Sequence, residues 1–261
     1  MGETPVSLFK AEGISVRFGG IRAVDSVSFD VQPGEVFSII GPNGAGKTTI
    51  FNLISRIYNS TEGKLFFDGQ DITRTPPHRI AGLGIARTFQ NIELFANASL
   101  LQNLLIGRHC HAATGVLAQM GFLPSARRDE LRHREKAEDV IAFLGLERYR
   151  DTLIANLPYG VRKVVELGRA LCTEPKLLLL DEPSSGLNVE ETEGMGFWIE
   201  DIKKDLGITV IMVEHDMSLV NQVSDRVMAL NYGKVLSMGS PRDVQSDPEV
   251  IRAYLGGEVE A

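Results

Sequence analysis

Residues 41–48 read Gly-Pro-Asn-Gly-Ala-Gly-Lys-Thr, a complete match to the pattern G-x-x-x-x-G-K-[ST]. The apolar run Val36–Ile40 precedes this stretch, and Ile50, Leu53, Ile54 and Ile57 follow it at the i, i+3, i+4 and i+7 spacing of one helix face, so the context is strand, loop and helix. Glycines let successive backbone N–H groups face an anion, and the helix adds its positive N-terminal end. A glycine-rich turn that capped a helix by chance would not also supply Lys-Thr at this offset. We call residues 41–48 the phosphate loop and expect it to bind a nucleoside triphosphate.

Two side chains of the phosphate loop have distinct expected roles. The Lys47 ammonium is placed to reach the β- and γ-phosphates, and the Thr48 hydroxyl is suited to ligate the magnesium ion that bridges them. The loop thus predicts Mg²⁺ as a cofactor. The other residues expected to contact the nucleotide here are Gly41, Pro42, Asn43, Gly44, Ala45, Gly46 and Thr49.

The composition is that of an ordinary globular chain of 261 residues, with 43% hydrophobic and 23% charged residues. This length can bury a large core and fits one α/β domain with an inserted or appended subdomain. The net charge of −7 argues against nucleic acid as the main partner, because such proteins normally carry a basic surplus. Two cysteines far apart in the sequence predict no disulfide framework and a reducing compartment.

Membrane segments are not expected from the sequence. No apolar run approaches the ~18 residues of a transmembrane helix, and residues 1–5 lack the apolar core of a secretory leader. We therefore expect any role at a membrane to depend on a partner.

Apolar patterning predicts an α/β fold in several parts. Residues 8–16 and 24–31 read as antiparallel strands, and residues 177–180 and 208–213 as buried parallel strands. Helical patterns dominate from about 97 to 150, and a hairpin is expected within 226–239. We expect a single domain over residues 1–261. Its expected parts are a nucleotide-binding core with a β subdomain (1–95 and 157–240), a helical subdomain (96–156) and a C-terminal helix (241–261).

Two carboxylates follow four consecutive leucines at the end of the strand 177–180. Parallel sheets place their chemistry at the carboxyl ends of strands. Asp181 is placed to hold magnesium, through water, and Glu182 to polarise the attacking water. In isolation, Asp181 and Glu182 could be two surface acids that follow a core strand. The presence of the phosphate loop makes this the weaker interpretation.

Two further polar residues end expected strands. Gln90 ends the strand that begins at Ile85, and a neutral amide can coordinate magnesium and the attacking water without acting as a base. His215 ends the strand 208–213 and could donate a hydrogen bond to the γ-phosphate or to the attacking water. Taken alone, Gln90 reads as a solvated loop residue and His215 as a structural histidine.

Residues 157–160, Leu-Pro-Tyr-Gly, open a helix that runs to about residue 171. A glycine-bearing loop at a helix start can bind an anion, although alone it is an ordinary helix N-terminus. The helix is expected to bury Val161, Val164, Val165, Gly168 and Leu171 and to turn Arg162, Lys163, Glu166 and Arg169 away from the core.

Phe18 lies in a glycine-bounded turn, Arg17-Phe18-Gly19-Gly20, where an aromatic face could stack on a base. Without the neighbouring nucleotide motif, a phenylalanine that packs in the turn would be the better interpretation.

These motifs, in this order, resemble the ATP-binding cassette (ABC) ATPase family over nearly the whole chain. The resemblance implies a P-loop NTPase core with a RecA-like mixed sheet, an antiparallel β subdomain, an inserted α-helical subdomain, and ATP as the nucleotide. Within the family, Ala-Arg-Thr-Phe-Gln (86–90), Gly-Leu-Asn (186–188), Glu-His-Asp-Met (214–217) and Val-Ile-Arg-Ala-Tyr-Leu-Gly (250–256) look like the ATPase subunit of branched-chain amino-acid importers.

The resemblance also assigns roles residue by residue. Phe18 becomes the adenine-stacking aromatic, with Val24 beside the nucleotide, and Gln90 the amide that couples to the membrane partner. His215 becomes the switch histidine and residues 185–188 the D-loop. Leu157, Pro158, Tyr159 and Gly160 become the signature loop, which would face the ATP of a second cassette in a head-to-tail pair. The residues expected to act in catalysis are Glu182, His215, Lys47 and Gln90, and those expected at the metal are Thr48, Gln90 and Asp181.

Two departures from the family pattern stand in the chain. The usual Leu-Ser-Gly-Gly-Gln signature reads Leu-Pro-Tyr-Gly-Val here, so Pro158 offers neither a hydroxyl nor a backbone N–H, and Val161 replaces the amide. Asn188 replaces the usual D-loop aspartate and removes a charge at the expected dimer seam. The change at Pro158 leaves open how strongly this half-site closes on ATP. Because Glu182 and His215 are intact, we expect the site built on this chain's own phosphate loop to remain hydrolytic.

The partners that the resemblance implies are a second ABC ATPase, identical or paralogous, and transmembrane permease subunits. A solute-binding protein would act indirectly, and the chain would sit on the cytoplasmic face of the cell membrane. Alternatives with similar nucleotide motifs are an exporter ATPase of the lipopolysaccharide type, a soluble cassette ATPase acting on DNA or ribosomes, and a non-hydrolysing regulatory subunit.

Overall fold

The computed structural model describes residues 7–111 and 124–255. Residues 1–6, the part of the expected helical subdomain at 112–123 and the end of the expected C-terminal helix at 256–261 lie outside the described residues. Over the described parts, no helix has both the length and the apolarity needed to cross a membrane.

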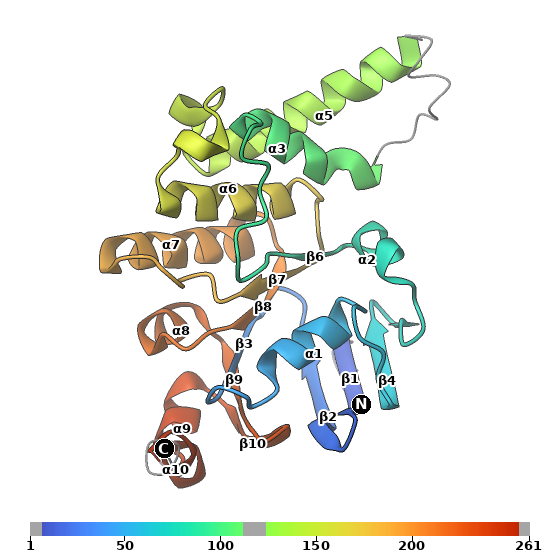
Figure 1. The fold of residues 1–261 in the computed structure, drawn as a ribbon, viewed down its shortest axis with the longest axis vertical. Coiled ribbons are helices and arrows are strands. Elements are labelled where there is room, and N and C mark those ends of the chain that lie inside the picture. Colours follow the sequence, from blue (N-terminus) through green and yellow to red (C-terminus); the bar gives the residue numbers. More distant parts are fainter. Residues whose placement is uncertain (1–6, 112–123, 256–261) are drawn as a thin grey trace, which may run out of the picture.

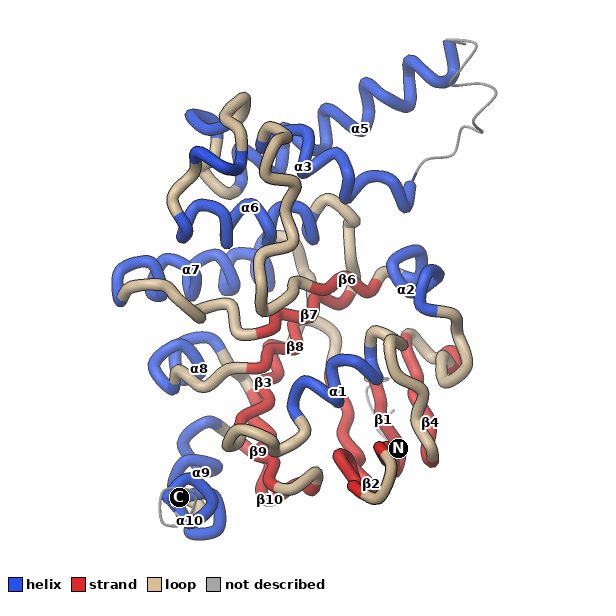
Figure 2. Tube along the Cα trace, viewed as in Figure 1, coloured by secondary structure: helices blue, strands red, loops and turns tan. Residues whose placement is uncertain are grey.

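Four strands from the first third of the chain form an antiparallel sheet (Figures 1 and 2). Inward-facing residues such as Phe9, Ala11 and Phe29 are buried while their neighbours along the strands are exposed, which is the period-two pattern of a half-buried strand. The predicted antiparallel β subdomain is confirmed. Its strands, in spatial order, are β2 (Ile21–Val31), β1 (Phe9–Phe18), β4 (Glu62–Phe67) and β5 (Gln70–Asp71).

A second, mixed sheet forms the centre of the molecule. Its middle strands are parallel and buried along their whole length, because helices cover both faces. The last two strands form the predicted antiparallel hairpin at one edge. The strands in spatial order are β10 (Lys234–Gly239), β9 (Arg226–Asn231), β3 (Val36–Ile40), β8 (Thr209–Val213), β7 (Leu177–Asp181) and β6 (Ile85–Arg87).

The register of this sheet aligns the ends of three strands. Val213 of β8 pairs with Ile39 of β3 on one side and with Asp181 of β7 on the other. The loops that follow β3, β7 and β8 therefore leave the same edge of the sheet, and these loops begin with Gly41, Glu182 and Glu214.

Two hydrophobic cores lie on opposite faces of the mixed sheet, each between the sheet and the helices that cover that face. Leu177 and Leu179 of β7 pack with α1 (Lys47–Ile54), whereas Leu178 and Leu180 pack with α6 (Tyr159–Leu171). Figure 1 shows α1 on one side of the strands and α6 on the other. On the α6 side the sheet is also covered by α7 (Val189–Asp205) and α8 (Met217–Val223).

A group of helices lies beyond α6, as Figure 2 shows. Helix α3 packs against α6 and begins with a capping box between Ser99 and Gln102. The elements of this group are α3 (Leu100–Gly107), α5 (Pro124–Phe143) and the short 3₁₀ helices η1 (Arg108–His111), η2 (Glu147–Tyr149) and η3 (Ile154–Asn156). A separate short helix, α2 (Pro77–Leu83), leads into β6.

Two helix boundaries differ from the sequence-based expectation. The C-terminal region holds two helices, α9 (Pro241–Ser246) and α10 (Pro248–Leu255), in place of one. The break falls at Asp247, with ψ at 122°, because a proline disfavours the helical conformation of the residue before it. Helix α1 ends at Ile54, so Ile57 does not extend its buried face and is 50% exposed.

Candidate functional site

The phosphate loop has the backbone that its glycines predict. Gly41, Gly44 and Gly46 have φ angles of 149°, 80° and 104°. A Cβ on Gly41 would lie 2.2 Å from Leu230 O, and one on Gly46 would lie 2.5 Å from Ala23 O, so neither position has room for a side chain. Gly46 is the N-cap of α1 and provides no side-chain cap, which leaves the positive end of this helix open to an anion.

Lys47 folds back over the phosphate loop. Its Nζ donates hydrogen bonds to Gly41 O at 2.7 Å and to Pro42 O at 3.0 Å. Burial lowers the pKa of the Lys47 ammonium, and the negative charges of Glu182 and Asp181 act in the opposite direction. The ammonium is thus held beside the loop by carbonyl groups and by the field of the two carboxylates.

The other loop residues divide by exposure. Asn43, Gly44 and Thr48 are exposed, Gly41 and Ala45 are buried, and Pro42, Gly46 and Thr49 are partly buried. The turn of the β9–β10 hairpin supports the loop from behind, because Gly233 N donates to Ala45 O at 2.9 Å. Thr48, on the first turn of α1, is thus an exposed residue at the end of the loop.

The two residues expected near the base are placed differently. Phe18 is 45% exposed and its ring meets Tyr58 edge-on, with the centroids 5.1 Å apart. Val24 is fully buried in β2 and lies behind the phosphate loop, with its Cγ2 3.6 Å from the position of a Cβ on Gly46. Phe18 thus offers an open aromatic surface, while Val24 shapes the loop from behind.

Asp181 ends β7 in a buried ion pair that the sequence did not predict. Arg87 Nη2 lies 2.7 Å from Asp181 Oδ2, and both side chains are less than a tenth exposed. The same guanidinium donates to Asn52 Oδ1 of α1 at 2.7 Å and to Oγ of Ser55, the C-cap of α1, at 3.0 Å. Arg87 therefore ties the carboxylate to the helix that follows the phosphate loop.

Glu182 and Gln90 lie together, as their expected roles require. Gln90 Nε2 donates a hydrogen bond to Glu182 Oε2 at 2.8 Å. Glu182 has φ at 49°, a left-handed conformation that residues other than glycine rarely adopt. Its backbone N–H is held by Val213 O of β8 at 2.9 Å. The sharp turn after β7 thus directs this carboxylate out of the sheet edge toward the amide of Gln90.

His215 follows β8 and its side chain is 60% exposed. Its position is fixed by Glu214, a fully buried carboxylate that sequence reasoning did not single out. Glu214 accepts hydrogen bonds from Ser184 N at 2.8 Å, His215 N at 2.8 Å and Asp216 N at 3.1 Å. This one side chain therefore joins the loop after β7 to the loop after β8.

The signature-loop residues 157–160 contact the D-loop of the same chain. Tyr159 Oη donates to Ser185 O at 3.3 Å, and a Cβ on Gly186 would lie 2.8 Å from the Tyr159 ring. Pro158 is the N-cap of α6, Leu157 is buried, and Gly160 leaves room for the Glu191 carboxylate. Asn188 caps α7 through a capping box with Glu191. Because α6 and α1 cover opposite faces of the sheet, this loop and the phosphate loop form separate surfaces of one chain.

The expectation that Lys163 and Glu166 face away from the core is wrong. They are 4% and 2% exposed. The two side chains point toward the ends of β6 and β7, where backbone groups of neighbouring loops provide their partners. Helical periodicity missed them because it counts only apolar residues as buried.

The residues at this edge of the sheet fit a magnesium ion held together with phosphates. Across residues 7–111 and 124–255, no three His, Cys, Asp or Glu side chains gather as a metal site made of protein ligands alone would require. Magnesium usually takes one or two carboxylates and completes its shell with water and substrate phosphates. The oxygen ligands available are those of Asp181, Thr48 and Gln90.

Comparison with known proteins agrees with this geometry. A family profile described as "ABC transporter" matches residues 24–185, and one described as "Branched-chain amino acid ATP-binding cassette transporter" matches residues 234–260. The high-affinity branched-chain amino acid transport ATP-binding protein BraF of Pseudomonas aeruginosa is 39% identical over 249 residues, covering 95% of this chain and 98% of that protein. LivG of Escherichia coli, described in the same words, is 37% identical with the same coverage.

Solved structures show the same fold. An ATP-binding cassette of an ABC transporter in its ADP conformation superposes with a TM-score of 0.85 at 33% identity, covering 96% of this chain and 99% of that chain. CbiO1 of Clostridium perfringens, described as part of the ABC transporter complex cbiONQ, gives a TM-score of 0.79 at 28% identity, covering 98% and 99%. With the motifs, the fold and full-length relatives in agreement, the chain belongs to the family of ATP-hydrolysing, ATP-binding subunits of ABC transporters.

Proposed function

We propose that this protein is the ATP-hydrolysing motor subunit of an ABC importer for branched-chain or related amino acids. The observation that carries this proposal is the similarity to BraF and LivG, which extends over 95% of this chain and nearly all of each relative. The match of residues 234–260 to the branched-chain amino acid cassette profile supports the same substrate class from a separate part of the sequence.

The site supports in-line attack of water on the γ-phosphate of ATP. The N–H groups of the phosphate loop and the N-terminus of α1 bind the phosphates, and the Lys47 ammonium offsets charge on the β- and γ-phosphates. Glu182 orients and deprotonates the attacking water, with its carboxylate positioned by Gln90. His215, exposed at the end of β8, donates a hydrogen bond to the γ-phosphate or to the water.

When bound, a magnesium ion would supply positive charge that offsets the charge of the phosphates. Thr48 and Asp181 would hold it, with the Gln90 amide as a further oxygen ligand. Arg87 keeps one oxygen of Asp181 occupied, so the other oxygen is the one available to the metal or its water.

The proposed partners follow from the family. ATP is bound between the phosphate loop of this chain and the signature loop of a second cassette, identical or paralogous. Residues 96–156 act as the helical subdomain that passes closure and reopening to permease subunits through Gln90, and a solute-binding protein delivers the amino acid. The protein is thus held peripherally at the cytoplasmic face of the membrane.

Pro158 supports a difference between the two composite ATP sites. It lacks a backbone N–H and a hydroxyl, so the site that receives this signature loop closes less tightly on ATP than the site built on this chain's own phosphate loop. Pro158 therefore favours a complex whose two ATP sites are unequal. Glu182 and His215 are present in this chain, so its own site keeps the residues needed for hydrolysis.

The experiment that tests the function is transport by the reconstituted complex. Membrane proteins that copurify with this chain are incorporated into proteoliposomes with the matching solute-binding protein, and uptake of radiolabelled leucine is measured with ATP on the side of the cassette. We expect ATP-dependent uptake, abolished by Glu182→Gln. Outward transport of a lipid substrate would contradict the proposal in favour of an exporter, and a complex without ATPase activity would favour a regulatory subunit.

A further inference from the structure

Helix α6 sends a row of three charged side chains to the backbone of residues 88–93, the segment after β6 that we call the glutamine loop. Lys163 Nζ donates to Gln90 O at 3.2 Å, and Glu166 Oε1 accepts from Phe89 N at 3.3 Å. Arg169 Nη1 donates to Glu93 O. The three residues are spaced i, i+3 and i+6, so they lie along one face of the helix. The glutamine loop is therefore fastened to α6 along its length.

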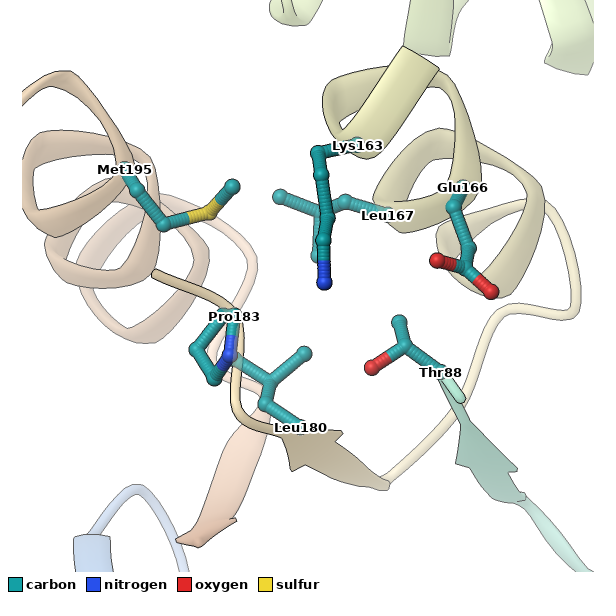
Figure 3. A pocket seen from close by; sticks show the side chains of 7 residues that line it. All are labelled: Thr88, Lys163, Glu166, Leu167, Leu180, Pro183 and Met195. Atoms are coloured by element: carbon teal, nitrogen blue, oxygen red, sulfur yellow. The ribbon is translucent and has the colours of Figure 1, made fainter. Parts of the chain in front are cut away.

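Lys163 differs from the other two because it also contacts the loop after β7. Its Nζ donates to Glu182 O at 3.3 Å, so one ammonium bridges the carbonyl groups of Gln90 and Glu182. Figure 3 shows the Lys163 side chain extending from α6 toward Leu180, Pro183 and Thr88, with Met195 on one side and Glu166 on the other. These residues line a small cavity that is mostly apolar apart from Lys163, Glu166 and Thr88.

The ammonium is held in this apolar surrounding by charge as well as by hydrogen bonds. Burial lowers the pKa of Lys163, while Glu166, Glu214, Glu182 and Asp181 favour its protonated form. Burial raises the pKa of Glu166, its nearest acidic neighbour on α6. A buried lysine whose ammonium is bonded to two carbonyls is costly to displace, because its loss removes a donor from both carbonyl groups.

We infer that Lys163 is a positioning residue. It links α6 to the backbone of Glu182 and to the glutamine loop, and so fixes the position of the catalytic glutamate relative to that loop. Glu182 has a left-handed backbone at φ 49°, and this conformation persists only where its surroundings enforce it. Val213 O accepts from the N–H of Glu182, and the Glu182 carbonyl accepts from Lys163 Nζ and from the N–H of Ser185, so both sides of the residue are fixed. The inference rests on the proposed role of Glu182 as the base.

One consequence is that the position of α6 affects the geometry of Glu182 in the same chain. Movement of α6 relative to the mixed sheet changes the bond from Lys163 to Glu182, whereas the bonds from Glu166 and Arg169 act on the glutamine loop. Lys163 is thus the side chain of this row that links α6 directly to the backbone of Glu182.

The test compares Lys163→Met, which keeps the length of the side chain and removes its donors, with Arg169→Met on the same helix. Arg169 binds the glutamine loop at Glu93 and makes no contact with Glu182. ATPase kinetics of the assembled complex and hydrogen–deuterium exchange of the nucleotide-free chain are both measured. We expect Lys163→Met to lower kcat by at least about tenfold with the ATP dissociation constant within about twofold, since small misplacements of catalytic groups reduce rate more than binding.

Hydrogen exchange separates positioning from general loosening. Lys163→Met is expected to accelerate exchange in both 88–93 and 181–188, Arg169→Met only in 88–93, and Lys163→Arg to regain part of both kcat and protection. A kcat for Lys163→Met within about twofold of the native value, or equal effects of Lys163→Met and Arg169→Met on 181–188, would overturn the inference. If Lys163→Met does not fold, Lys163→Met with Glu166→Gln removes both buried charges and serves as the test variant under the same criteria.

Glu182→Gln is measured in parallel so that the two proposals fail separately. If Glu182→Gln loses turnover while Lys163→Met keeps it, the positioning role alone is contradicted. If Glu182→Gln keeps turnover, the assignment of the base is wrong, and the exchange of 181–188 alone decides whether Lys163 holds this backbone.

Discussion

Gln90 Nε2 and Glu182 Oε2 are joined by a hydrogen bond of 2.8 Å, although the residues are 92 positions apart in the chain. The amide belongs to the loop after β6 and the carboxylate to the turn after β7, two neighbouring strands of the mixed sheet. This bond orients the Glu182 carboxylate toward the glutamine loop.

Replacement of Gln90 by Met keeps the side-chain length and removes the donor to Glu182. We expect kcat for ATP hydrolysis to fall by roughly ten- to a hundredfold, because the base loses its orientation, while the affinity for ATP stays nearly constant. Steady-state ATPase kinetics and a nucleotide-binding titration of the same preparation check this. A variant with native kcat would show that the bond to Gln90 does not position the base.

The Arg87→Met variant should be less stable to unfolding than the native protein. The substitution leaves the Asp181 carboxylate buried without its cation, which costs on the order of 3–5 kcal/mol for a buried pair. Urea denaturation measures the change in unfolding free energy. The matched control is Arg134→Met, which removes an exposed i, i+4 pair with Glu130 and is expected to cost about 0.5 kcal/mol or less. Equal effects of the two variants would contradict the structural role given to Arg87.

Gly46→Ala should destroy nucleotide binding. Its φ of 104° is strained for alanine, and its Cβ would lie 2.5 Å from Ala23 O, so the loop must shift away from the conformation that directs its N–H groups at phosphate. Isothermal titration with ATP provides the measurement. Gly82→Ala in α2 is the control, because a Cβ there meets nothing within 4 Å and helix propensity favours alanine by about 1 kcal/mol. ATP binding by Gly46→Ala at native affinity would be evidence against the phosphate loop.

Asp216 stabilises the start of α8 and introduces a pH dependence. It is the N-cap, and the hydrogen bond from the Ser218 side chain holds the pKa of its carboxyl below the usual value. A carboxyl whose pKa is lowered by folding contributes stability above the unfolded pKa of about 4, and this contribution is lost as the pH falls through the folded value.

Two variants of Asp216 separate the cap from the charge. Asp216→Ala is expected to lose about 1 kcal/mol of unfolding free energy at neutral pH. Asp216→Asn keeps a capping oxygen, so its deficit relative to the native protein should be small at pH 7 and should vanish as the pH falls below about 4. Chemical denaturation at several pH values gives both quantities, and a deficit of Asp216→Asn that grows on acidification would contradict this account.

The parts that the sequence predicts well are those where the physical cause is local. The glycines of residues 41–48 set the conformation of the phosphate loop whatever surrounds it, and the leucines of β7 mark a strand that is buried on both faces. The turn at Glu182 follows directly from the end of that strand. These features depend on neighbours in the chain, so a pattern of residues is enough to find them.

The parts that it misses depend on partners distant in the chain. Lys163 and Glu166 occupy positions that helical periodicity assigns to solvent, and they are buried because the backbone of Phe89, Gln90 and Glu182 satisfies them. Arg87 pairs with a carboxylate 94 positions away, and Glu214 joins two loops that the sequence shows only as strand ends. The signal for Glu214 in the sequence is a carboxylate that directly follows the largely apolar run 208–213.

The assignment of Glu182 as the residue that activates water is tested most directly by Glu182→Gln in the purified complex. ATP binding and ATP turnover are measured on the same preparation, with Mg²⁺ present. The account predicts binding at the native affinity and turnover reduced by at least about a hundredfold, since general-base catalysis contributes roughly 10²–10⁴-fold. Turnover close to the native rate would contradict it.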